Sequence, residues 1–198
     1  MTAMPAVSTV TGPDGRPRCP WGASTPDYRE YHDTEWGVPL HGTAALFERL
    51  SLEAFQSGLS WLTILRKREA FRRAFHGFDP VVVAAFTDDD VARLLTDRSI
   101  VRNHAKITAT VRNARAVTEL GADLDALLWS FAPDPAARPA PVSLAEVAAR
   151  TPESEAMARA LRRRGLRFVG PVTCHALMQA TGMVNDHLAG CFRRATAG

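Results

Sequence analysis

The chain has 198 residues, of which 46% are hydrophobic and 23% are charged. That length is enough for one well-buried core, and the balance of apolar and charged residues is typical of a soluble globular protein. No apolar run approaches the roughly 20 residues that a membrane-spanning helix needs, so we expect no membrane-embedded part. The formal net charge of +3 is too small to identify a polyanionic partner by itself.

The N-terminal stretch is rich in Pro, Gly and Thr and lacks the basic start and apolar centre of a signal peptide. We therefore interpret residues 1–18 as a flexible extension and expect ordered structure to begin near Cys19. The chain has three cysteines, and this odd, sparse set argues against a disulfide framework. Cysteines of this kind more often bind metals or fill cores.

The positive charge comes almost entirely from arginine, because Lys67 and Lys106 are the only lysines. Basic residues cluster at 66–73, at 98–115 and at 159–167. Each cluster fits an ordinary solvated helix face, and together they are also compatible with a phosphate-binding face.

Apolar residues recur with helical spacing along most of the chain, whereas alternating strand patterns are almost absent. The sequence therefore predicts an all-α fold. Acceptor side chains mark several helix starts, because Asp79 precedes a proline and Thr87 stands three residues before Asp90. The predicted helices cover residues 46–55, 61–75, 81–86, 91–95, 100–121, 152–161 and 169–181.

The second half of the chain carries further local signals. Residues 132–142 are too rich in proline to form a helix and predict a surface loop. Ser143 and Glu146 form a capping-box pattern, and Thr151 followed by proline repeats the signal for a helix start.

Two pairs of metal-binding side chains stand near opposite ends of the predicted ordered chain. His187 and Cys191 are four residues apart, so on a helix they project from one face, one turn apart. Cys19 and His32 supply a second pair, and two Cys with two His is the closed tetrahedral set typical of structural zinc. Spacing alone is a weak signal, because buried cysteines with a capping histidine give the same pattern. Cys174-His175 is a rival source of ligands.

The segment 19–39, CPWGASTPDYREYHDTEWGVP, resembles the opening of the DNA-3-methyladenine glycosylase I family, which belongs to the helix-hairpin-helix superfamily. The resemblance continues in order through LEAFQSGLSWLTILRKREAFRRAF, FDPVVVAAF, IVRNHAKITATVRNARA and FVGPVTCHALMQATGMVNDHLAGC. It covers essentially the whole chain from Cys19 to Cys191.

The resemblance implies a helix-hairpin-helix DNA glycosylase fold with a zinc clasp that joins the N- and C-terminal segments. Residues 19–198 would form a single domain of two helical lobes with the base pocket between them. One structural Zn²⁺ ion would be bound by the family's four ligands, which fall on Cys19, His32, His187 and Cys191. A catalytic zinc is disfavoured, because four protein ligands leave no open position for water.

The resemblance also implies a pocket for a base rotated out of the duplex and held between aromatic surfaces. The aromatic positions fall on Trp21, Tyr28, Tyr31 and Trp61. The catalytic role falls on Glu53, whose carboxylate would accept hydrogen bonds from the adenine edge; aromatic faces and a carboxylate both favour a cationic methylated base. Taken singly, each residue also fits an ordinary core or surface position. The neighbouring DNA-facing loop contains Gln56, Gly58, Leu59 and Ser60.

The implied reaction is hydrolysis of the N-glycosidic bond of 3-methyladenine, which releases the free base and leaves an abasic site. No lysine nucleophile is evident, so we expect no strand cleavage. Relatives in the superfamily often place an aspartate against the developing sugar cation, but the family resembled here lacks it, and neither Asp123 nor Asp125 is assigned that role.

The helices on either side of residues 97–99 are expected to form the helix-hairpin-helix, whose backbone N–H groups bind phosphate whatever the base sequence. Ser99 stands where the family usually has glycine, which puts the hairpin geometry in question. Arg102 and Lys106 are expected to approach phosphates. His175 is a second departure, at a position where relatives commonly have tyrosine.

We expect a monomeric base-excision repair enzyme in the cytoplasm, acting on double-stranded DNA that contains alkylated bases. The alternative is a zinc-stabilised DNA-binding helical protein of the same fold without catalytic activity. The intact Glu53, Tyr28 and Tyr31 argue against that alternative.

Overall fold

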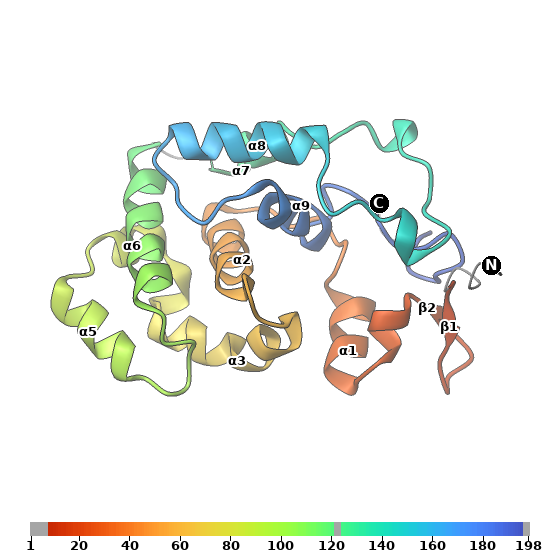
Figure 1. Cartoon of the computed structure of the whole chain (residues 1–198), viewed down its shortest axis with the longest axis horizontal. Helices are drawn as coiled ribbons and strands as arrows, with labels where there is room; N and C mark the ends of the chain where they lie inside the picture. The colour runs from red at the N-terminus through yellow and green to blue at the C-terminus, as the bar shows by residue number, and fades with distance from the viewer. Residues whose placement is uncertain (1–7, 121–123, 196–198) are drawn as a thin grey trace, which may run out of the picture. The chain divides into compact units, whose positions relative to one another are not determined.

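The computed structural model describes residues 8–120 and 124–195 and is mainly helical, as the sequence predicts. The chain forms two compact units (Figure 1). Unit 1 comprises Met1–Pro39, Ala132–Ala149 and Met178–Gly198, and unit 2 comprises Leu40–Phe131 and Arg150–Leu177. Among the described residues, no helix is both long enough and apolar enough to cross a membrane.

Unit 1 is assembled from three separate stretches of the chain. Its regular elements are the strands β1 (Val10–Thr11) and β2 (Pro17–Arg18), the 3-10 turns η1 (Pro20–Ala23), η3 (Pro135–Ala137) and η4 (Leu144–Glu146), and the helix α1 (Pro26–Thr34). Its C-terminal stretch begins with the last residues of α9 (Pro171–Ala180), most of which belongs to unit 2.

Unit 2 contains most of the helices. These are α2 (Thr43–Gln56), α3 (Trp61–Ala74), α4 (Pro80–Ala84), α5 (Asp88–Thr96), α6 (His104–Glu119), α7 (Leu124–Trp129) and α8 (Pro152–Arg163), with the 3-10 turn η2 (His76–Phe78) after α3.

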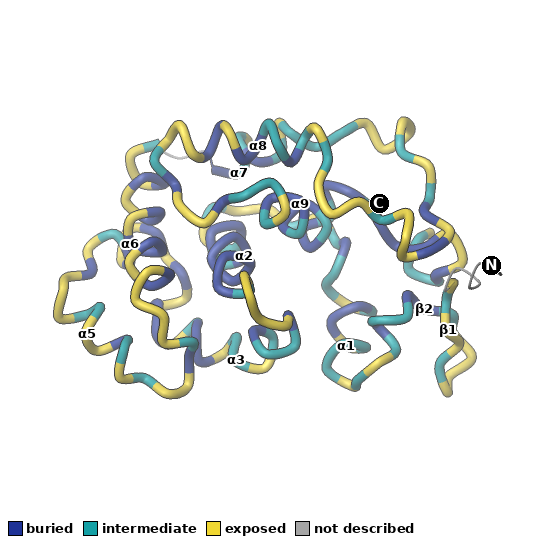
Figure 2. The backbone as a smooth tube through the Cα atoms, in the orientation of Figure 1, coloured by how far each residue is buried: buried dark blue, intermediate teal, exposed yellow. Residues whose placement is uncertain are grey.

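The core of unit 2 is a cluster of phenylalanine rings around α2 and α3. Phe55 lies 4.6 Å from Phe71 between ring centroids, and Phe75 stacks 5.3 Å from Phe78. All four rings are fully buried, and aromatic side chains of this size dominate core energetics. Figure 2 shows α2 buried along most of its length, and its polar residues Arg49, Ser51 and Glu53 lie in the interior.

Local capping signals predicted several helix starts correctly. Asp79 caps α4, and Thr87 with Asp90 forms a complete capping box at α5. Thr151 caps α8 with Ser154 as the reciprocal partner. These starts could be predicted because a capping hydrogen bond depends only on residues a few positions apart.

Two predicted starts were wrong. α6 begins at His104 instead of Ile100, because the side chain of Asn103 accepts a hydrogen bond from the Lys106 N–H and caps the helix there. The capping-box pattern at Ser143 opens only the single 3-10 turn η4, in which Ser143 makes no capping bond to the backbone.

The expectation that ordered structure begins near Cys19 was also wrong. Residues 10–18 form an antiparallel hairpin that pairs Val10 with Arg18. Arg18 is buried and forms ion pairs with Asp14 at 2.6 Å and Asp33 at 2.7 Å. Two-residue strands leave no alternation in the sequence, so this hairpin gave no periodic signal. Residues 1–7 of the predicted extension lie outside the described part of the chain.

Candidate functional site

Four buried side chains meet in unit 1, and their ligand atoms all lie within 4.8 Å of one another. They are the predicted set of Cys19, His32, His187 and Cys191. The sulfur of Cys191 lies 3.4 Å from His32 Nε2 and 3.6 Å from His187 Nδ1, and the sulfur of Cys19 lies 3.8 Å from His187 Nδ1. With Zn–S near 2.3 Å and Zn–N near 2.1 Å, a tetrahedron has S–N edges of roughly 3.6 Å. These side chains can therefore bind a metal ion.

Local structure brings each ligand into place. His32 lies in the last turn of α1, and Gly22 in η1 passes so close that a Cβ there would stand 2.5 Å from His32 Cγ. His187 and Cys191 lie on turns instead of a regular helix, and the Cys191 N–H donates to Leu188 O at 2.8 Å. The four-residue spacing therefore brings the two side chains together through a turn.

Neighbouring acceptors orient both imidazole rings. His32 Nδ1 donates to Asp33 Oδ1 at 2.8 Å, and His187 Nε2 donates to the carbonyl oxygen of Trp36 at 3.1 Å. Each ring is thereby left with its other nitrogen facing the cluster, as metal-binding histidines usually are. Arg18 in turn donates to Asp33 from Nε and Nη2.

The sequence did not predict that Arg18, Asp33 and Trp36 belong to this centre. Asp33 could have been found, because a carboxylate directly after a candidate histidine ligand is a natural orienting partner. Trp36 contributes a backbone oxygen, which leaves no signature in the sequence.

Cys19 and Cys191 shift each other's pKa in opposite directions. The hydrogen bond from Cys19 lowers the pKa of Cys191 far below its usual range, and hydrogen bonds with His187 and His32 lower it further. The same contact with Cys191, together with burial, raises the pKa of Cys19. The pair therefore favours a thiolate at Cys191, and thiolate is the form that binds metals.

The rival ligand pair Cys174-His175 does not join this cluster. Both residues are buried in α9, and burial raises the pKa of Cys174 to about 12. Among the described residues, the cluster in unit 1 is the only group of three or more His, Cys, Asp or Glu side chains suited to a metal.

Unit 1 also brings together three of the predicted base-binding aromatics. Trp21 packs edge-on against Tyr28, with ring centroids 5.7 Å apart, and lies 6.3 Å from Tyr31. Trp21 also packs edge-on against Trp36 at 5.0 Å and His32 at 5.1 Å. The aromatic cluster is therefore continuous with the candidate metal centre.

In unit 2, Glu53 lies on the buried helix α2. Burial raises the pKa of Glu53 to about 7, and the charge of Arg49 lowers it only in part. Arg49 stands one turn earlier on α2, and its guanidinium lies 6.0 Å from the ring of Trp61 at the start of α3. Arg49 was not identified from the sequence, although an i, i+4 pair of opposite charges within an apolar helix was a usable signal.

The predicted DNA-facing loop is a short turn between α2 and α3. Gln56 ends α2, Gly58 has φ of +81°, and the hydroxyl of Ser60 caps α3 by accepting from the Thr63 N–H. Leu59, in this turn, is 43% exposed. The turn therefore presents an apolar side chain to solvent.

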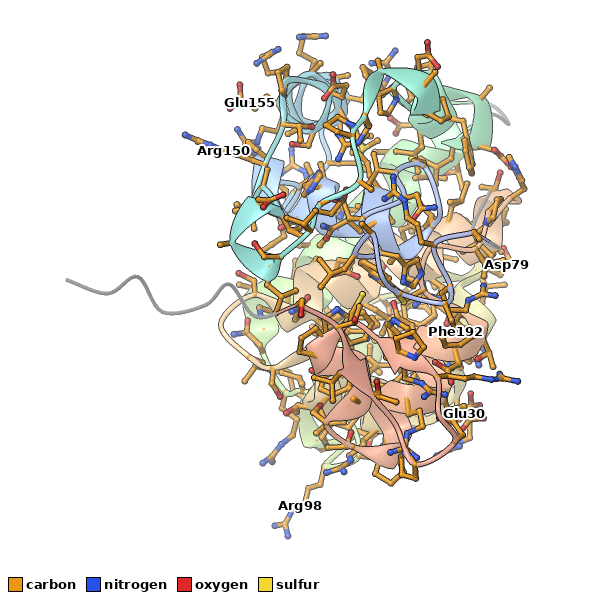
Figure 3. The ribbon with its side chains drawn as sticks, turned by 90° about the vertical axis from the view of Figure 1, so that its right-hand side faces the viewer. Glu30, Asp79, Arg98, Arg150, Glu155 and Phe192 are labelled. Atoms are coloured by element: carbon orange, nitrogen blue, oxygen red, sulfur yellow. The ribbon has the colours of Figure 1, made fainter. Side chains whose placement is uncertain are left out.

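The three predicted phosphate-contacting residues occupy different environments. Ser99 is exposed, and both its N–H and its hydroxyl donate to Asp97 Oδ1, at 2.8 and 2.5 Å. Ser99 is not among the described residues with positive φ, so serine fits this turn without strain. Arg102 is exposed, and Arg98 next to Ser99 extends into solvent (Figure 3). Lys106, in contrast, is buried, and its ammonium donates to backbone carbonyls of unit 2.

Asp125, to which the sequence assigned no catalytic role, makes hydrogen bonds near the start of α2. Its carboxylate accepts hydrogen bonds from His41 Nδ1 at 2.9 Å and from the Gly42 N–H at 2.6 Å, at the start of α2. Asp123 lies outside the described residues.

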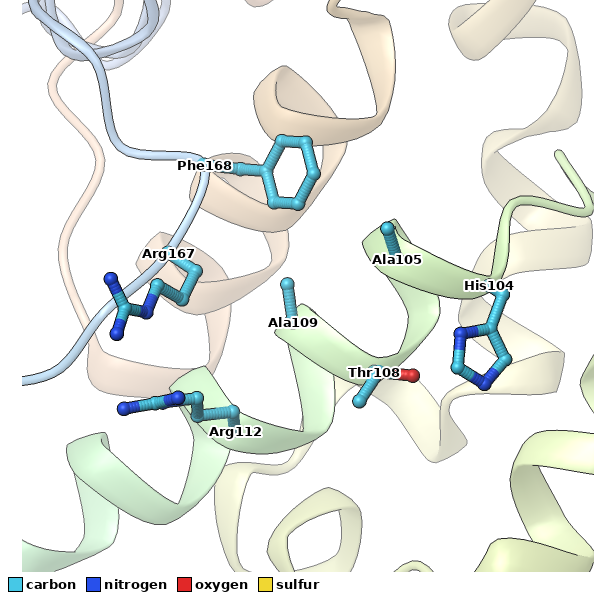
Figure 4. A pocket seen from close by; sticks show the side chains of 7 residues that line it. All are labelled: His104, Ala105, Thr108, Ala109, Arg112, Arg167 and Phe168. Carbon is cyan, nitrogen blue, oxygen red and sulfur yellow. The ribbon is translucent and has the colours of Figure 1, made fainter.

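A separate hollow of about 410 Å³ lies beside α6, and Figure 4 shows the side chains that line it. Arg112 and Arg167 extend in the same direction at one side of it, and Phe168, 40% exposed, stands beside them with φ of +56°. The amide of Asn113 holds Arg167 in place, donating to its carbonyl at 3.0 Å and accepting from its N–H at 2.7 Å. None of the residues predicted for the site lines this hollow.

Comparison with known proteins gives consistent matches over most of the chain. Residues 21–194 match the family described as methyladenine glycosylase. The chain is 45% identical over 177 residues to DNA-3-methyladenine glycosylase 1 of Escherichia coli strain K12, covering 88% of this chain and 95% of that protein.

Solved structures give the same match. A crystal structure of 3-methyladenine DNA glycosylase I has a TM-score of 0.82 and 45% identity, covering 88% of this chain and 98% of that one. A tyrosine-to-phenylalanine variant of a 3-methyladenine DNA glycosylase I, in complex with 3-methyladenine, has a TM-score of 0.81 and 33% identity, covering 89% of this chain and 97% of that one.

Proposed function

Since the chain belongs to the methyladenine glycosylase family, we propose that it removes 3-methyladenine from double-stranded DNA containing alkylated bases. The enzyme would act in base-excision repair, as a monomer in the cytoplasm, and would leave an abasic site without cutting the strand. The observation that carries this proposal is the buried carboxyl of Glu53, which lies on the core helix α2 and has a pKa raised to about 7.

The buried carboxyl supports a role in recognising a cationic base. A carboxylate taken out of water needs a compensating partner, and 3-methyladenine within DNA carries a positive charge. We propose that Glu53 accepts hydrogen bonds from the adenine edge, and that the faces of Trp21, Tyr28, Tyr31 and Trp61 hold the base after it leaves the helix. Trp21, Tyr28 and Tyr31 belong to unit 1, and Glu53 and Trp61 belong to unit 2.

The proposed reaction needs little acid or base assistance. The bond between the sugar C1′ and the base nitrogen breaks, and its electron pair neutralises the cationic base as it departs. A water molecule adds to C1′ and loses a proton. Because the methylated base is already a good leaving group, binding the rotated base supplies most of the selectivity.

We propose that the metal centre holds one structural zinc ion. Two thiolates and two imidazoles complete its tetrahedron, so the ion would cross-link the chain and take no part in the reaction. The spacing of the ligand atoms and the orienting contacts from Asp33 and Trp36 support this assignment.

The decisive test of the activity is the release of free 3-methyladenine from methylated duplex DNA by the purified protein. We expect Glu53→Ala to lower the rate by about 100-fold or more, which is about 3 kcal/mol of lost transition-state stabilisation. Glu69→Ala, at an exposed carboxylate on α3, is the matched control and should keep the wild-type rate. The proposal fails if the wild-type protein releases no base.

The metal assignment is tested by elemental analysis. The wild-type protein should contain about one zinc per chain, and His187→Ala should contain much less. His104→Ala, at an exposed histidine outside the cluster, should retain the metal. Unchanged metal content in His187→Ala would exclude this histidine as a ligand.

A further inference from the structure

We propose that Lys106 is a positioning residue for base excision, because its ammonium fixes the exposed turn 57–60 to the core of unit 2. The contacts of Lys106 with Phe55 and Ser57 hold the turn whatever the protein's activity. The effect of Lys106 on excision rests on the proposed function, and the experiment below separates the two.

The ammonium of Lys106 lies at the end of α2. It donates to Phe55 O at 2.8 Å and to Ser57 O at 2.5 Å, and the residue is only 7% exposed. The last carbonyls of a helix have no partner within the helix, so a cation placed there satisfies them and complements the helix dipole. The interaction ties α6 to α2, since the backbone of Lys106 is itself held by the cap at Asn103.

The two carbonyls bracket the point where α2 gives way to the turn. Within the turn, the Ser57 N–H donates to Ala54 O at 3.3 Å and the Leu59 N–H to Gln56 O at 2.6 Å. These bonds are local to the turn, whereas Lys106 fixes it from another helix, 51 residues from Phe55 and 49 from Ser57. Loss of the ammonium would therefore let the turn move without unfolding α2.

The turn contains exposed residues that we propose to face DNA, so a movement of the turn would change the proposed DNA contact. Gly58, with φ of +81°, has no atom within 4 Å of where a Cβ would stand, and Leu59 is exposed at the tip. At Gly58, therefore, no side-chain packing stiffens the turn. Glu53 lies one turn earlier in the same helix, so Lys106 also holds the exposed turn in register with the carboxyl proposed to bind the base.

The chain offers a matched control in Lys67, the only other lysine. Its ammonium donates to Arg98 O at 3.3 Å and to Ser99 O at 2.9 Å, which is the same chemistry at a different turn. Each turn also contains a reporter amide with a defined acceptor. These are the Leu59 N–H, bonded to Gln56 O, and the Ser99 N–H, bonded to Asp97 Oδ1.

Hydrogen exchange of these two amides tests the geometric claim. In Lys106→Met we expect exchange at Leu59 to accelerate roughly ten- to a hundredfold, as for loss of a hydrogen bond from a charged donor, with Ser99 unchanged. Lys67→Met should show the reverse pattern. Unchanged exchange at Leu59 in folded Lys106→Met, or equal acceleration at both amides, would overturn the proposal.

Excision kinetics test the functional claim. Lys106→Met should lose more than tenfold in kcat/KM on methylated duplex DNA yet bind free 3-methyladenine within about threefold of wild type, because the turn acts on DNA and not on the free base. Lys106→Arg, which keeps a cationic donor, should recover part of the rate. Equal losses of excision and free-base binding would instead indicate general destabilisation and reject a positioning role.

The hydrogen-exchange experiment and the kinetic experiment test separate claims, so each can fail without the other. If the wild-type protein excises no base, the proposed function is wrong, but the exchange pattern still decides whether Lys106 holds the turn. If Lys106→Met does not fold, ¹⁵N-lysine labelling of the folded wild-type protein replaces it, because only two side-chain signals exist and Lys67→Met assigns them. A Lys106 ammonium signal broadened away by solvent exchange would contradict the buried contacts.

Discussion

At the scale of single residues, Glu53 illustrates how burial changes the chemistry of one side chain. Its carboxyl lies among the core residues of α2, and removal from water raises its pKa to about 7 although Arg49 opposes the change. The folded protein therefore binds a proton at Glu53 more tightly than the unfolded chain does. A cationic ligand would reverse that preference by stabilising the charged carboxylate.

This shift predicts a pH-dependent effect of Glu53→Gln on stability. The pKa of Glu53 is raised in the folded state, so protonation of Glu53 stabilises the folded protein, and this stabilisation is fully present below the ordinary pKa of 4.5. It is lost as the pH rises through about 7. We expect the variant to match wild type at pH 4.5 and to be more stable by up to roughly 3 kcal/mol at pH 8. Denaturant unfolding at both pH values measures the difference, and Glu69→Gln is the control. An identical difference at both values would contradict the shift.

A second prediction concerns the close approach of Gly22 to His32. A methyl group at Gly22 would stand 2.5 Å from His32 Cγ, so Gly22→Ala should displace the imidazole, destabilise the fold by about 1–3 kcal/mol and lower the metal content. Gly170→Ala is the matched control, since a Cβ there meets only Arg162 Nη2 at 3.6 Å. Normal metal content in Gly22→Ala would show that His32 accommodates the methyl group.

Residue identities at the metal centre were predictable, but their surroundings were not. Ligand chemistry permitted the set of Cys19, His32, His187 and Cys191, and family resemblance selected it over Cys174-His175. The contacts made by Arg18 and by the carbonyl of Trp36 depend on the folded path of unit 1. The same holds for Lys106, whose burial under the end of α2 contradicts the simple expectation that a lysine in a basic cluster is solvated.

At the scale of elements, the helix starts at α4, α5 and α8 were predictable from their local caps. Thr87, Thr151 and Asp79 satisfy exposed N–H groups of their own helices, so their pattern is local. The start of α6 was misplaced because residues 100–103 continue the apolar and basic composition of the helix without being helical. The capping-box pattern at Ser143 did not lead to an α-helix, because a capping motif does not supply the apolar face by which a helix packs.

The capping box at α5 gives a prediction at this scale. Thr87→Ala removes the hydroxyl that accepts from the Asp90 N–H and donates to the Asp90 carboxylate, so we expect a loss of about 1 kcal/mol in the free energy of unfolding. Thr96→Ala, in the last turn of the same helix, removes only a hydroxyl that donates to Arg93 O. Its effect should stay within about 0.5 kcal/mol. Equal losses in the two variants would assign the effect to side-chain propensity.

At the scale of the whole molecule, the metal centre joins segments far apart in the sequence. Cys19 and His187 are separated by 168 residues, and unit 1 is built from three discontinuous stretches. No local pattern encodes such a pairing, so periodicity could predict most helices of unit 2, though not α7, but could not predict the composition of unit 1. A cross-link over so long a loop restricts the unfolded chain strongly.

Removal of the metal should therefore destabilise the protein substantially. We expect a strong chelator to lower the Tm by roughly 10 °C or more, because binding free energy at a structural site is folding free energy. Calorimetry with and without the chelator measures the change, and restoration of the Tm by added Zn²⁺ is the control. A Tm that does not depend on the chelator, in protein shown to have lost its metal, would contradict a structural role.

The discontinuity of unit 1 also sets an order of events during synthesis. Unit 2 ends at Leu177, so its whole sequence leaves the ribosome before His187 and Cys191 do. Cys19 and His32 are synthesised early, whereas the other two residues of the cluster are added only near the end of translation. A nascent chain can therefore complete the helices of unit 2 before the four side chains of the cluster are all present, and a product that ends before residue 187 lacks two of them.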